Sequence, residues 1–211
     1  MQFATWKPVY LEILDDFGFS LKRDEEAAKI LCELLRNKRQ SLSDANALLF
    51  GRDAIIVGNA PTLESELDDQ NDSTIKEAIF VAADGATSTL LKKDIIPEMI
   101  VTDLDGPFEA ILEANQRGSI AIVHAHGDNL DALKISVPQL GRIIGTVQCR
   151  PPEGLYNFGG FTDGDRSVFL AKELGASSIS LLGFDFEDES VTPRKKKKLA
   201  WAKRLIDMAL I

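Results

Sequence analysis

The sequence predicts an α/β fold: a doubly wound, mostly parallel sheet of about six strands with helices on both faces, plus an N-terminal helical extension. From residue 53 onward, short apolar runs alternate with segments of helical character. Runs such as 54–57 and 120–123 are continuously apolar, which is typical of parallel strands covered on both faces. Several runs end in glycine or an acidic residue, the usual start of a strand-to-helix turn.

Composition limits the classes of protein that the chain can belong to. Its 211 residues are 45% hydrophobic and 27% charged, which fits a globular domain. The formal net charge of -9 disfavours nucleic acid and anionic membranes as partners. Cys32 and Cys149 form no CxxC pair, so we expect neither a disulfide framework nor a zinc site. Without a membrane-spanning apolar stretch or a signal-peptide pattern, the sequence predicts a cytoplasmic protein.

The chain is expected to divide at about residue 50. Residues 1–50 are predicted to form an N-terminal helical region, and residues 51–211 an α/β domain that carries the candidate catalytic residues and a C-terminal helix. Ser20 suits the N-cap of a helix that runs to about Gln40, and residues 43–44 begin a shorter helix. We identify no chemistry in this first region and interpret it as a layer for packing or for a homodimer.

The remaining elements follow in a regular order. The expected strands are 54–57, 78–83, 99–102, 120–123, 142–147 and 178–182. Helices are expected after each of them, and Pro193 begins a closing helix. In that helix the basic run 194–198 is interpreted as a solvated face, with a place beside a triphosphate as the alternative.

Two carboxylates follow the expected strand 99–102. Asp103 and Asp105 are separated by Leu104, and continued strand geometry would point both to the same side. Ligands bind beyond the carboxyl ends of strands in an open parallel sheet. Two carboxylates on one side repel unless a cation lies between them, and Mg²⁺ bound to polyphosphate takes one or two carboxylates. A polar turn without a ligand is the alternative.

Other expected strands also end in polar residues at the same rim. These residues are Gly58, Asn59, Asp84, Gly85, His124–Asn129 and Asp185. The loop at 58–62 would offer backbone N–H groups to an anion at the start of a helix. His126 and Asp128 are candidate contacts to a metal or to substrate. Zinc is disfavoured because a third ligand of matching type is missing.

The segment 151–165 is polar, rich in glycine and long for a connection, and long ordered loops are usually functional. Thr162 or Asp163 can cap the helix that follows. Arg166 lies in the first turn of that helix and suits bidentate contact with phosphate. An ion pair with Asp163 or Asp165 at the surface is the alternative for Arg166.

Five motifs occur in order, at residues 58–62, 83–86, 97–106, 124–129 and 157–166. Together they resemble the archaeal 6-hydroxymethyl-7,8-dihydropterin diphosphokinases, the MptE-like family, over about residues 51–190. The family's catalytic part is similar to thiamin diphosphokinase, whose Ala-Asp-Gly-Gly and Asp-x-Asp stretches correspond here to residues 83–86 and 103–105. The later Asp-Lys-Asp motif of the thiamin enzymes is replaced by residues 124–129, which favours a pterin over thiamin.

The resemblance implies transfer of diphosphate from ATP to the hydroxymethyl group of the reduced pterin, with release of AMP, in folate or methanopterin biosynthesis. It implies Mg²⁺ on Asp103 and Asp105, with Asp84 and Asp128 as further contacts. His126 or Asp128 would accept the hydroxyl proton. The residues implied to hold nucleotide or line the cleft are Gly58, Asn59, Asp84, Gly85, Thr162, Asp163 and Arg166.

Three alternatives stay open at this point. Residues 101–106 also resemble the nucleophile motif of haloacid-dehalogenase-type phosphatases, whose first Asp forms an aspartyl-phosphate. Two expected strands precede the motif here, and Pro107 replaces the usual threonine or valine, so this alternative is disfavoured. A nucleotide-sugar glycosyltransferase is the second alternative, because Asp-x-Asp binds metal there and related domains occur in flagellin-glycosylation proteins. A non-catalytic nucleotide-binding module is the third.

Overall fold

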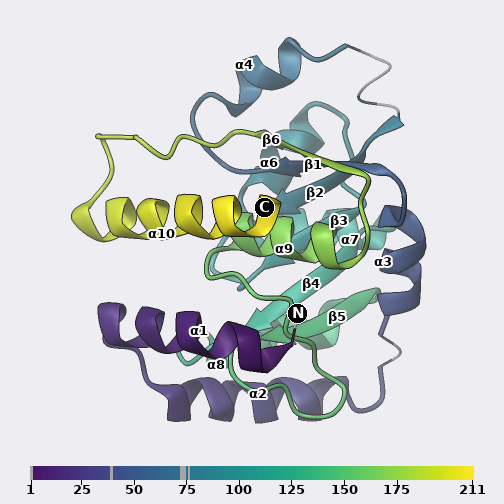
Figure 1. Ribbon diagram of the computed structural model, residues 1–211. Helices are drawn as coiled ribbons and strands as arrows, with labels where there is room; N and C mark the ends of the chain where they lie inside the picture. The colour runs from purple at the N-terminus through teal and green to yellow at the C-terminus, as the bar shows by residue number, and fades with distance from the viewer. Residues whose placement is uncertain (1, 39, 72–74, 76) are drawn as a thin grey trace.

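A parallel six-stranded sheet forms the centre of the molecule, as the sequence predicts (Figure 1). The computed structural model describes residues 2–38, 40–71, 75 and 77–211. The strands are β1 Asp53–Val57, β2 Ile79–Ala83, β3 Met99–Thr102, β4 Ile120–Ala125, β5 Ile143–Val147 and β6 Ser178–Leu182. Their order across the sheet is β5-β4-β3-β2-β1-β6, and every neighbouring pair is parallel.

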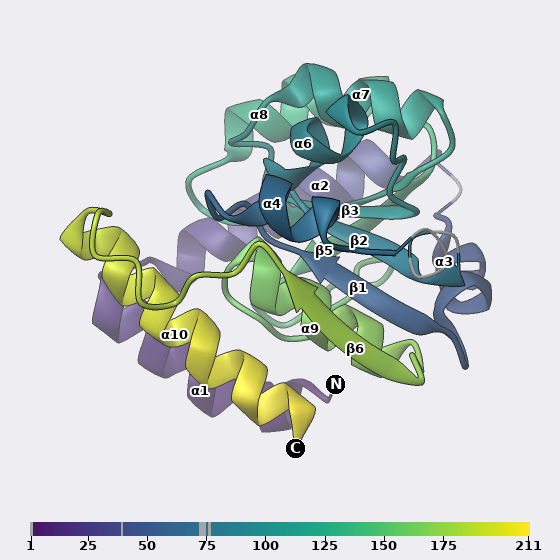
Figure 2. The ribbon, with the colours of Figure 1, turned by 90° about the horizontal axis from the view of Figure 1, so that it is seen from above.

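Helices cover both faces of this sheet. They are α1 Phe3–Phe17, α2 Leu21–Leu35, α3 Leu42–Leu49, α4 Leu63–Asp68, α6 Ala86–Lys92, α7 Phe108–Gln116, α8 Leu130–Ser136, the 3₁₀ helix η1 Val137–Gln139, α9 Asp163–Glu173 and α10 Pro193–Leu210. Figure 2 shows α4, α6, α7 and α8 on one face and α9 on the other. The chain crosses the sheet in one direction from β1 to β5 and then returns past β1 to form β6. Because crossovers between parallel strands are right-handed, the helices of the first series lie on one face and α9, in the return connection, lies on the other.

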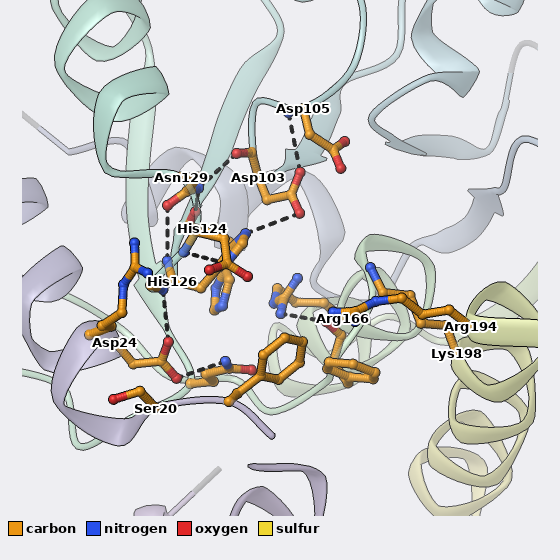
Figure 3. Close-up of a pocket in the computed structure, with 16 residues that line it drawn as sticks. Ser20, Asp24, Asp103, Asp105, His124, His126, Asn129, Arg166, Arg194 and Lys198 are labelled. Atoms are coloured by element: carbon orange, nitrogen blue, oxygen red, sulfur yellow. Dashed lines mark hydrogen bonds and ion pairs between the residues drawn. The ribbon is translucent and has the colours of Figure 1, made fainter. Parts of the chain in front are cut away.

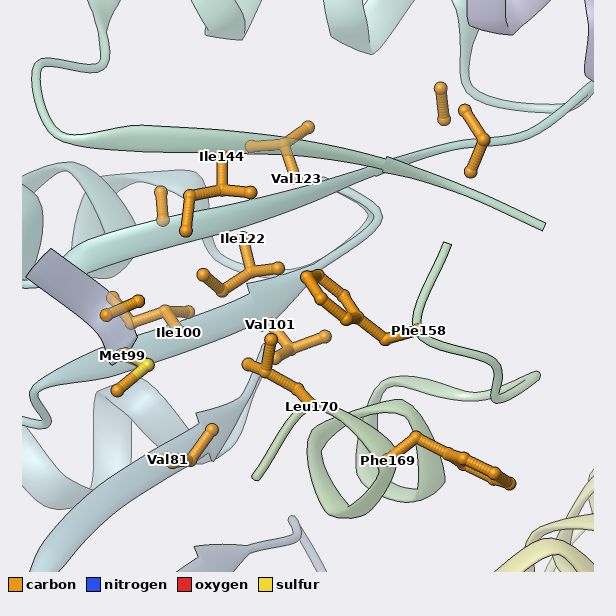
Figure 4. Packing of buried hydrophobic residues seen from close by; sticks show 14 of the residues in the cluster. Val81, Met99, Ile100, Val101, Ile122, Val123, Ile144, Phe158, Phe169 and Leu170 are labelled. Atoms are coloured by element: carbon orange, nitrogen blue, oxygen red, sulfur yellow. The ribbon is translucent and has the colours of Figure 1, made fainter. Parts of the chain in front are cut away.

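The burial of the strands follows their sequences, since the continuously apolar runs are buried. All residues of β2, β3, β4 and β5 are buried, whereas β6, at one edge of the sheet, alternates between exposed and partly buried positions until the buried Leu182. On the α9 face, Phe158 and Leu170 pack toward Val101 of β3 (Figure 4). This packing fixes the start of α9 over the middle of the sheet, beside the carboxyl ends of the strands.

The N-terminal helices pack onto the same core. Trp6 is fully buried, donates its indole N–H to the Gln148 carbonyl at 3.0 Å, and meets the ring of Phe169 edge-on at 6.1 Å between centroids. The helix after Ser20 ends at Leu35, earlier than expected. It packs against β4, β5 and α8. Residues of α1 and α2 therefore belong to the same buried cluster as the strands.

Helix α1 also lies beside α10, although the two come from opposite ends of the chain (Figure 2). Asp16 accepts hydrogen bonds from Lys197 and from the Trp201 indole, each at 2.7 Å, and Glu12 pairs with both terminal nitrogens of Arg204. These contacts place the first turns of α10 near the start of α2. Among the described residues, no helix combines the length and apolarity needed to cross a bilayer.

We predict that Trp6→Ala lowers the free energy of unfolding by about 3–5 kcal/mol, because it leaves a cavity in the shared core. Leu11→Ala is the matched control on the same helix, since Leu11 is 43% exposed, and it should change stability by no more than about 1 kcal/mol. Denaturant titration followed by tryptophan fluorescence and circular dichroism would measure both. The shared core predicts one cooperative transition, and two separate transitions would contradict it.

Candidate functional site

A cavity of about 230 Å³ opens beyond the carboxyl ends of β3 and β4 (Figure 3). Its walls come from six places in the chain: the start of α2, the loop after β3, the loop after β4, the end of β5, the start of α9 and the first turns of α10. Asp103 and Asp105 lie at one end and Arg166, Arg194 and Lys198 on another side, while Arg23 lies beside Asp24 and Gly127. The cavity therefore brings together residues that are as much as 179 positions apart, from Phe19 to Lys198.

Three carboxylates converge at one end of this cavity. Asp84, Asp103 and Asp105 each offer an oxygen within 4.8 Å of the others. Thr102 connects them, because its hydroxyl donates to Asp84 Oδ2 at 2.6 Å and accepts the Leu104 N–H at 2.8 Å. The ends of β2 and β3 are neighbours in the sheet, which is why residues 18 positions apart meet here.

The turn after β3, rather than strand alternation, aims these carboxylates. The strand ends at Thr102, and Leu104 has a φ of +68°, a left-handed conformation that costs a non-glycine residue about 1–2 kcal/mol. The Asp105 N–H donates to Asp103 Oδ1 at 3.3 Å. Gly106 has no room for a side chain, because an added Cβ would overlap the Asp84 carboxylate. The predicted reason for the convergence of Asp103 and Asp105 was therefore wrong.

The electrostatics of these carboxylates suit a small, oxygen-ligated cation. Burial and the charges of Asp103 and Asp105 raise the pKa of Asp84 to about 6. Burial and Asp103 also raise the pKa of Asp105. Burial opposes ionisation of Asp103, but its interaction with His126 outweighs burial and holds the Asp103 pKa below its usual range. Asp84 Oδ1 is buried without a hydrogen-bond partner among the described residues, an acceptor that a cation would satisfy.

The loop after β4 holds Asp103 in place. His126 Nδ1 accepts the Asp128 N–H at 3.3 Å, so the ring proton sits on Nε2 and faces Asp103 Oδ2, 3.3 Å away. The Asn129 amide donates to the carbonyls of Asp103 and His124, each at 2.7 Å, and accepts the His126 N–H. The loops after β3 and β4 are thus joined into one hydrogen-bonded unit.

His124 is buried deeper in the same wall. Its Nδ1 lies 3.2 Å from the Thr146 hydroxyl, which donates in turn to the Val123 carbonyl. Nδ1 therefore carries the ring proton, and Nε2 is an acceptor without a partner in the described part of the chain. Burial, and then the charge of Arg166, lower the pKa of His124 well below its usual value, so the ring is neutral.

The basic side of the cavity is formed by α9 and α10. Arg166 is 3% exposed and donates to Asp163 Oδ1 at 3.2 Å and to the Phe161 carbonyl at 3.0 Å. Its ion pair with Asp163 is thus part of a buried site rather than of the surface. Gly160, with a φ of +90°, lets the loop approach the Arg166 backbone, where a Cβ would clash. Arg194 and Lys198 line the cavity as well, although Lys195–Lys197 are exposed.

The residues proposed from the sequence fall into three groups. Those that line the cavity are Asp103, Asp105, His126, Asp128 and Arg166. Asp84 and Asp163 form the second group, which adjoins the lining. Asp84 lies close to the carboxylates of Asp103 and Asp105. Burial and the charge of Asp103 raise the pKa of Asp163 well above its usual value. The residues outside the described lining are Gly58, Asn59, Gly85, Thr162 and Asp185.

Local packing explains the positions of this last group. Gly58 packs against Gly183 and Phe184, and Gly85 against the Asn59 amide. Thr162 caps α9, where its N–H and hydroxyl both donate to the buried Asp165 carboxylate. Asp185 is exposed and accepts the Glu187 N–H.

Sequence reasoning missed the wall that the N-terminal region contributes. Phe19, Ser20, Arg23 and Asp24 line the cavity, in a region interpreted as packing alone. Asp24 is 4% exposed and accepts hydrogen bonds from the Tyr10 hydroxyl at 2.7 Å, the Gln148 amide at 2.9 Å and the Gly127 N–H at 2.8 Å. A signal existed: Asp24 precedes Ala27, Ala28 and Leu31 at helical spacing, a charge on an apolar face.

We predict that Asp84→Asn stabilises the cation-free protein near pH 7.5 by roughly 3 kcal/mol. The folded-state pKa of about 6 lies above the ~3.9 of an unfolded chain. The folded state therefore binds the proton more tightly, and stability falls as pH rises between these values. Wild type and variant should become equally stable below about pH 4.

Urea titrations in a chelating buffer at several pH values would measure this difference. Asp131→Asn, whose side chain is 94% exposed, is the control. A gain for Asp84→Asn that does not depend on pH would show that the charge of Asp84 is not the cause.

Comparisons with known proteins identify the family of this chain. The family model described as "6-hydroxymethylpterin diphosphokinase MptE-like" matches residues 28–190. A 6-hydroxymethyl-7,8-dihydropterin pyrophosphokinase of Methanothermobacter thermautotrophicus is 45% identical, over 98% of this chain and 94% of the relative. Proteins of the same name from Pyrococcus furiosus and Methanocaldococcus jannaschii are each 38% identical, over 98% of this chain and 94% and 95% of the relatives.

Among solved structures, a Maf glycosyltransferase from Magnetospirillum magneticum has a similar fold, with a TM-score of 0.53. The match covers 87% of this chain but only 34% of that protein, at 13% identity, so it supports the fold alone. The family model and the archaeal relatives support the family as well as the fold, because they match most of the sequence, including the strand ends that build the cavity. The chain therefore belongs to the MptE-like family of 6-hydroxymethylpterin diphosphokinases and is a diphosphokinase.

Proposed function

We propose that the protein transfers a diphosphoryl group from ATP, in the presence of Mg²⁺, to the hydroxymethyl group of 6-hydroxymethyl-7,8-dihydropterin, and that it releases AMP. The observation that supports this most directly is a cavity in which three converging carboxylates face the basic side chains of Arg166, Arg194 and Lys198. The archaeal relatives are named for the same pterin. The product would enter folate or methanopterin biosynthesis.

Asp103 and Asp105 are the proposed Mg²⁺ ligands, with Asp84 as a third. Carboxylate oxygens are the ligands that Mg²⁺ prefers, and the buried, unpartnered Asp84 Oδ1 fits this use. When bound, Mg²⁺ would neutralise phosphate charge and orient the triphosphate. Thr102 and His126 would act on the cation site only through the carboxylates that they contact.

The basic residues are placed to bind the triphosphate. Arg166 is held by Asp163 and by the Phe161 carbonyl, so its guanidinium is oriented before any ligand arrives. Phosphoryl transfer requires alignment and charge neutralisation more than covalent help. In the proposed step the hydroxymethyl oxygen attacks the β-phosphorus, and the bond from that phosphorus to the α–β bridging oxygen breaks. AMP leaves with the bonding electrons.

Asp128 is the proposed acceptor of the hydroxyl proton, in preference to His126. Both nitrogens of His126 are engaged, Nδ1 by the Asp128 N–H and Nε2 by Asp103. The Asp128 side chain lines the cavity and is exposed to it. A general base needs a free acceptor within hydrogen-bond reach of substrate, which the ring of His126 lacks in this arrangement.

The alternatives raised by the sequence have less support. The relatives are named pyrophosphokinases, which favours diphosphoryl transfer over phosphatase activity. Asp103 has its two oxygens engaged by the Asp105 N–H and by His126, which disfavours it as a nucleophile. The likeness to a glycosyltransferase concerns the fold, and function has to be argued from the site.

We predict that the purified protein, given ATP, Mg²⁺ and the reduced pterin, forms AMP and the pterin diphosphate in equal amounts. Asp103→Asn and Asp105→Asn should each lower the rate at least 100-fold, on the order of 3 kcal/mol of transition-state stabilisation. Asp131→Asn, an exposed carboxylate on α8, is the control and should keep wild-type activity.

Product chromatography would distinguish the alternatives in the same experiment. Phosphate release from simple esters without AMP would indicate a phosphatase, and turnover of a sugar nucleotide would indicate a glycosyltransferase. Unchanged turnover in both Asp variants would refute the proposed cation site.

We further predict that Lys198→Ala raises the KM for ATP about tenfold, equivalent to about 1.4 kcal/mol, and leaves the KM for the pterin nearly unchanged. Lys198 lines the cavity, whereas Lys195 on the same helix is exposed and outside the described lining. Lys195→Ala is therefore the matched control. Equal effects of the two substitutions would point to the general charge of α10 rather than to a contact with the triphosphate.

A further inference from the structure

One side of the cavity carries a buried acceptor that diphosphoryl transfer itself does not use. His124 is 2% exposed and lines the cavity, and its unprotonated Nε2 has no partner in the described part of the chain. Leaving a buried acceptor unpaired costs about 1–3 kcal/mol. Thr146 fixes the tautomer, because its hydroxyl donates to the Val123 carbonyl and can only accept from His124 Nδ1. The geometry therefore presents an acceptor to a ligand N–H.

Asp24 supplies a second acceptor in the same cavity. Its Oδ2 accepts two hydrogen bonds, from Tyr10 and Gln148, whereas within the described parts of the chain its Oδ1 accepts the Gly127 N–H alone. A carboxylate oxygen has two lone pairs, so Oδ1 keeps one free. The end of β5 holds both acceptors. Thr146 contacts His124, and Gln148 contacts Asp24. Gln148 follows Thr146 by two residues, so both side chains point to the same side.

Asp24 lies on the opposite side of the cavity from Arg194 and Lys198 (Figure 3). His124 lies between them, close enough to Arg166 for the charge of the guanidinium to lower the His124 pKa. Two aromatic side chains, Phe19 and Phe161, line the cavity between the acceptors and the basic residues, with 6.2 Å between their ring centroids and the Arg194 guanidinium 5.5 Å from the Phe19 ring centroid. Aromatic surface with a few fixed polar groups is what a planar heterocycle needs.

We propose that His124 Nε2 and Asp24 Oδ1 accept two N–H groups from the pyrimidine edge of the pterin, which makes this side of the cavity the heterocycle subsite. The proposal rests on the proposed function. A 2-amino-4-oxo pterin presents its 2-amino group and N3–H side by side, and the two acceptors in this cavity match that pair of donors. Adenine presents one amino group between two ring-nitrogen acceptors, so one of the two protein acceptors would face a lone pair.

The first experiment needs no variant. Calorimetry on the wild-type protein, without nucleotide, compares 6-hydroxymethylpterin with 6-hydroxymethyl-lumazine, which carries an oxygen in place of the 2-amino group. A site built to accept that amino group should bind the lumazine at least 100-fold more weakly, because a carbonyl would then face a buried acceptor. Equal affinity for the two compounds would overturn the proposal.

The second experiment uses variants of His124. His124→Phe keeps a ring and removes the acceptor, and it should weaken binding of 6-hydroxymethylpterin at least tenfold while leaving the affinity for a non-hydrolysable ATP analogue with Mg²⁺ unchanged. His124→Gln restores a side-chain acceptor and should recover part of the pterin affinity. Circular dichroism spectra and thermal unfolding of both variants establish that they are folded.

The outcomes separate this inference from the proposed function. Wild-type turnover of the pterin, together with unchanged pterin binding by His124→Phe, would overturn the subsite alone. Loss of nucleotide affinity with intact pterin affinity would assign the subsite to adenine and overturn it as well. Absence of both pterin binding and pterin turnover in the wild type would refute the proposed function, and the subsite with it.

Discussion

The mutual repulsion of three carboxylates is the constraint around which the site is organised. Asp84, Asp103 and Asp105 each offer an oxygen within 4.8 Å of the others, and burial, together with the charges of Asp103 and Asp105, raises the pKa of Asp84. The chain holds them there with a left-handed residue at Leu104 and with hydrogen bonds from Thr102. Such locally unfavourable arrangements are characteristic of functional sites, and a bound cation would relieve this one.

The parallel sheet decides where that arrangement can exist. The reversal of strand order lies between β1 and β6, where ligands often bind in doubly wound folds. Here the chain segments after those strands pack closely, since an added Cβ on Gly58 would meet the Gly183 carbonyl oxygen at 2.5 Å. The cavity lies beyond β3 and β4 instead. The glycine-rich loop before α9 then brings Arg166 across the sheet to face the carboxylates.

The two ends of the chain complete the cavity. Helix α2 supplies Asp24, Phe19 comes from the turn before it, and α10 supplies Arg194 and Lys198. The contacts between α1 and α10 hold these contributions in a fixed relation. The similarity to part of a glycosyltransferase shows that this fold serves other proteins too. In the proposed function, the terminal helices add a binding wall and two basic residues to the shared sheet.

The sequence by itself determined the local features of this protein. Continuous apolar runs specify buried parallel strands, and the residues that follow them specify which polar groups reach the rim, as the placement of Asp103 and His126 shows. The division of residues 1–50 from the rest stays a prediction, although their helices share the core of the sheet.

Only the tertiary structure decided the long-range features. It set Asp24 beside Gln148, 124 positions away, and brought Lys198 to the cavity. It also showed that a turn at Leu104, and not a continued strand, orients Asp103 and Asp105. Hydrophobic periodicity reports which face of an element is buried, but it carries no information about which distant element covers that face. Contacts of that kind are determined by the packing of the whole chain.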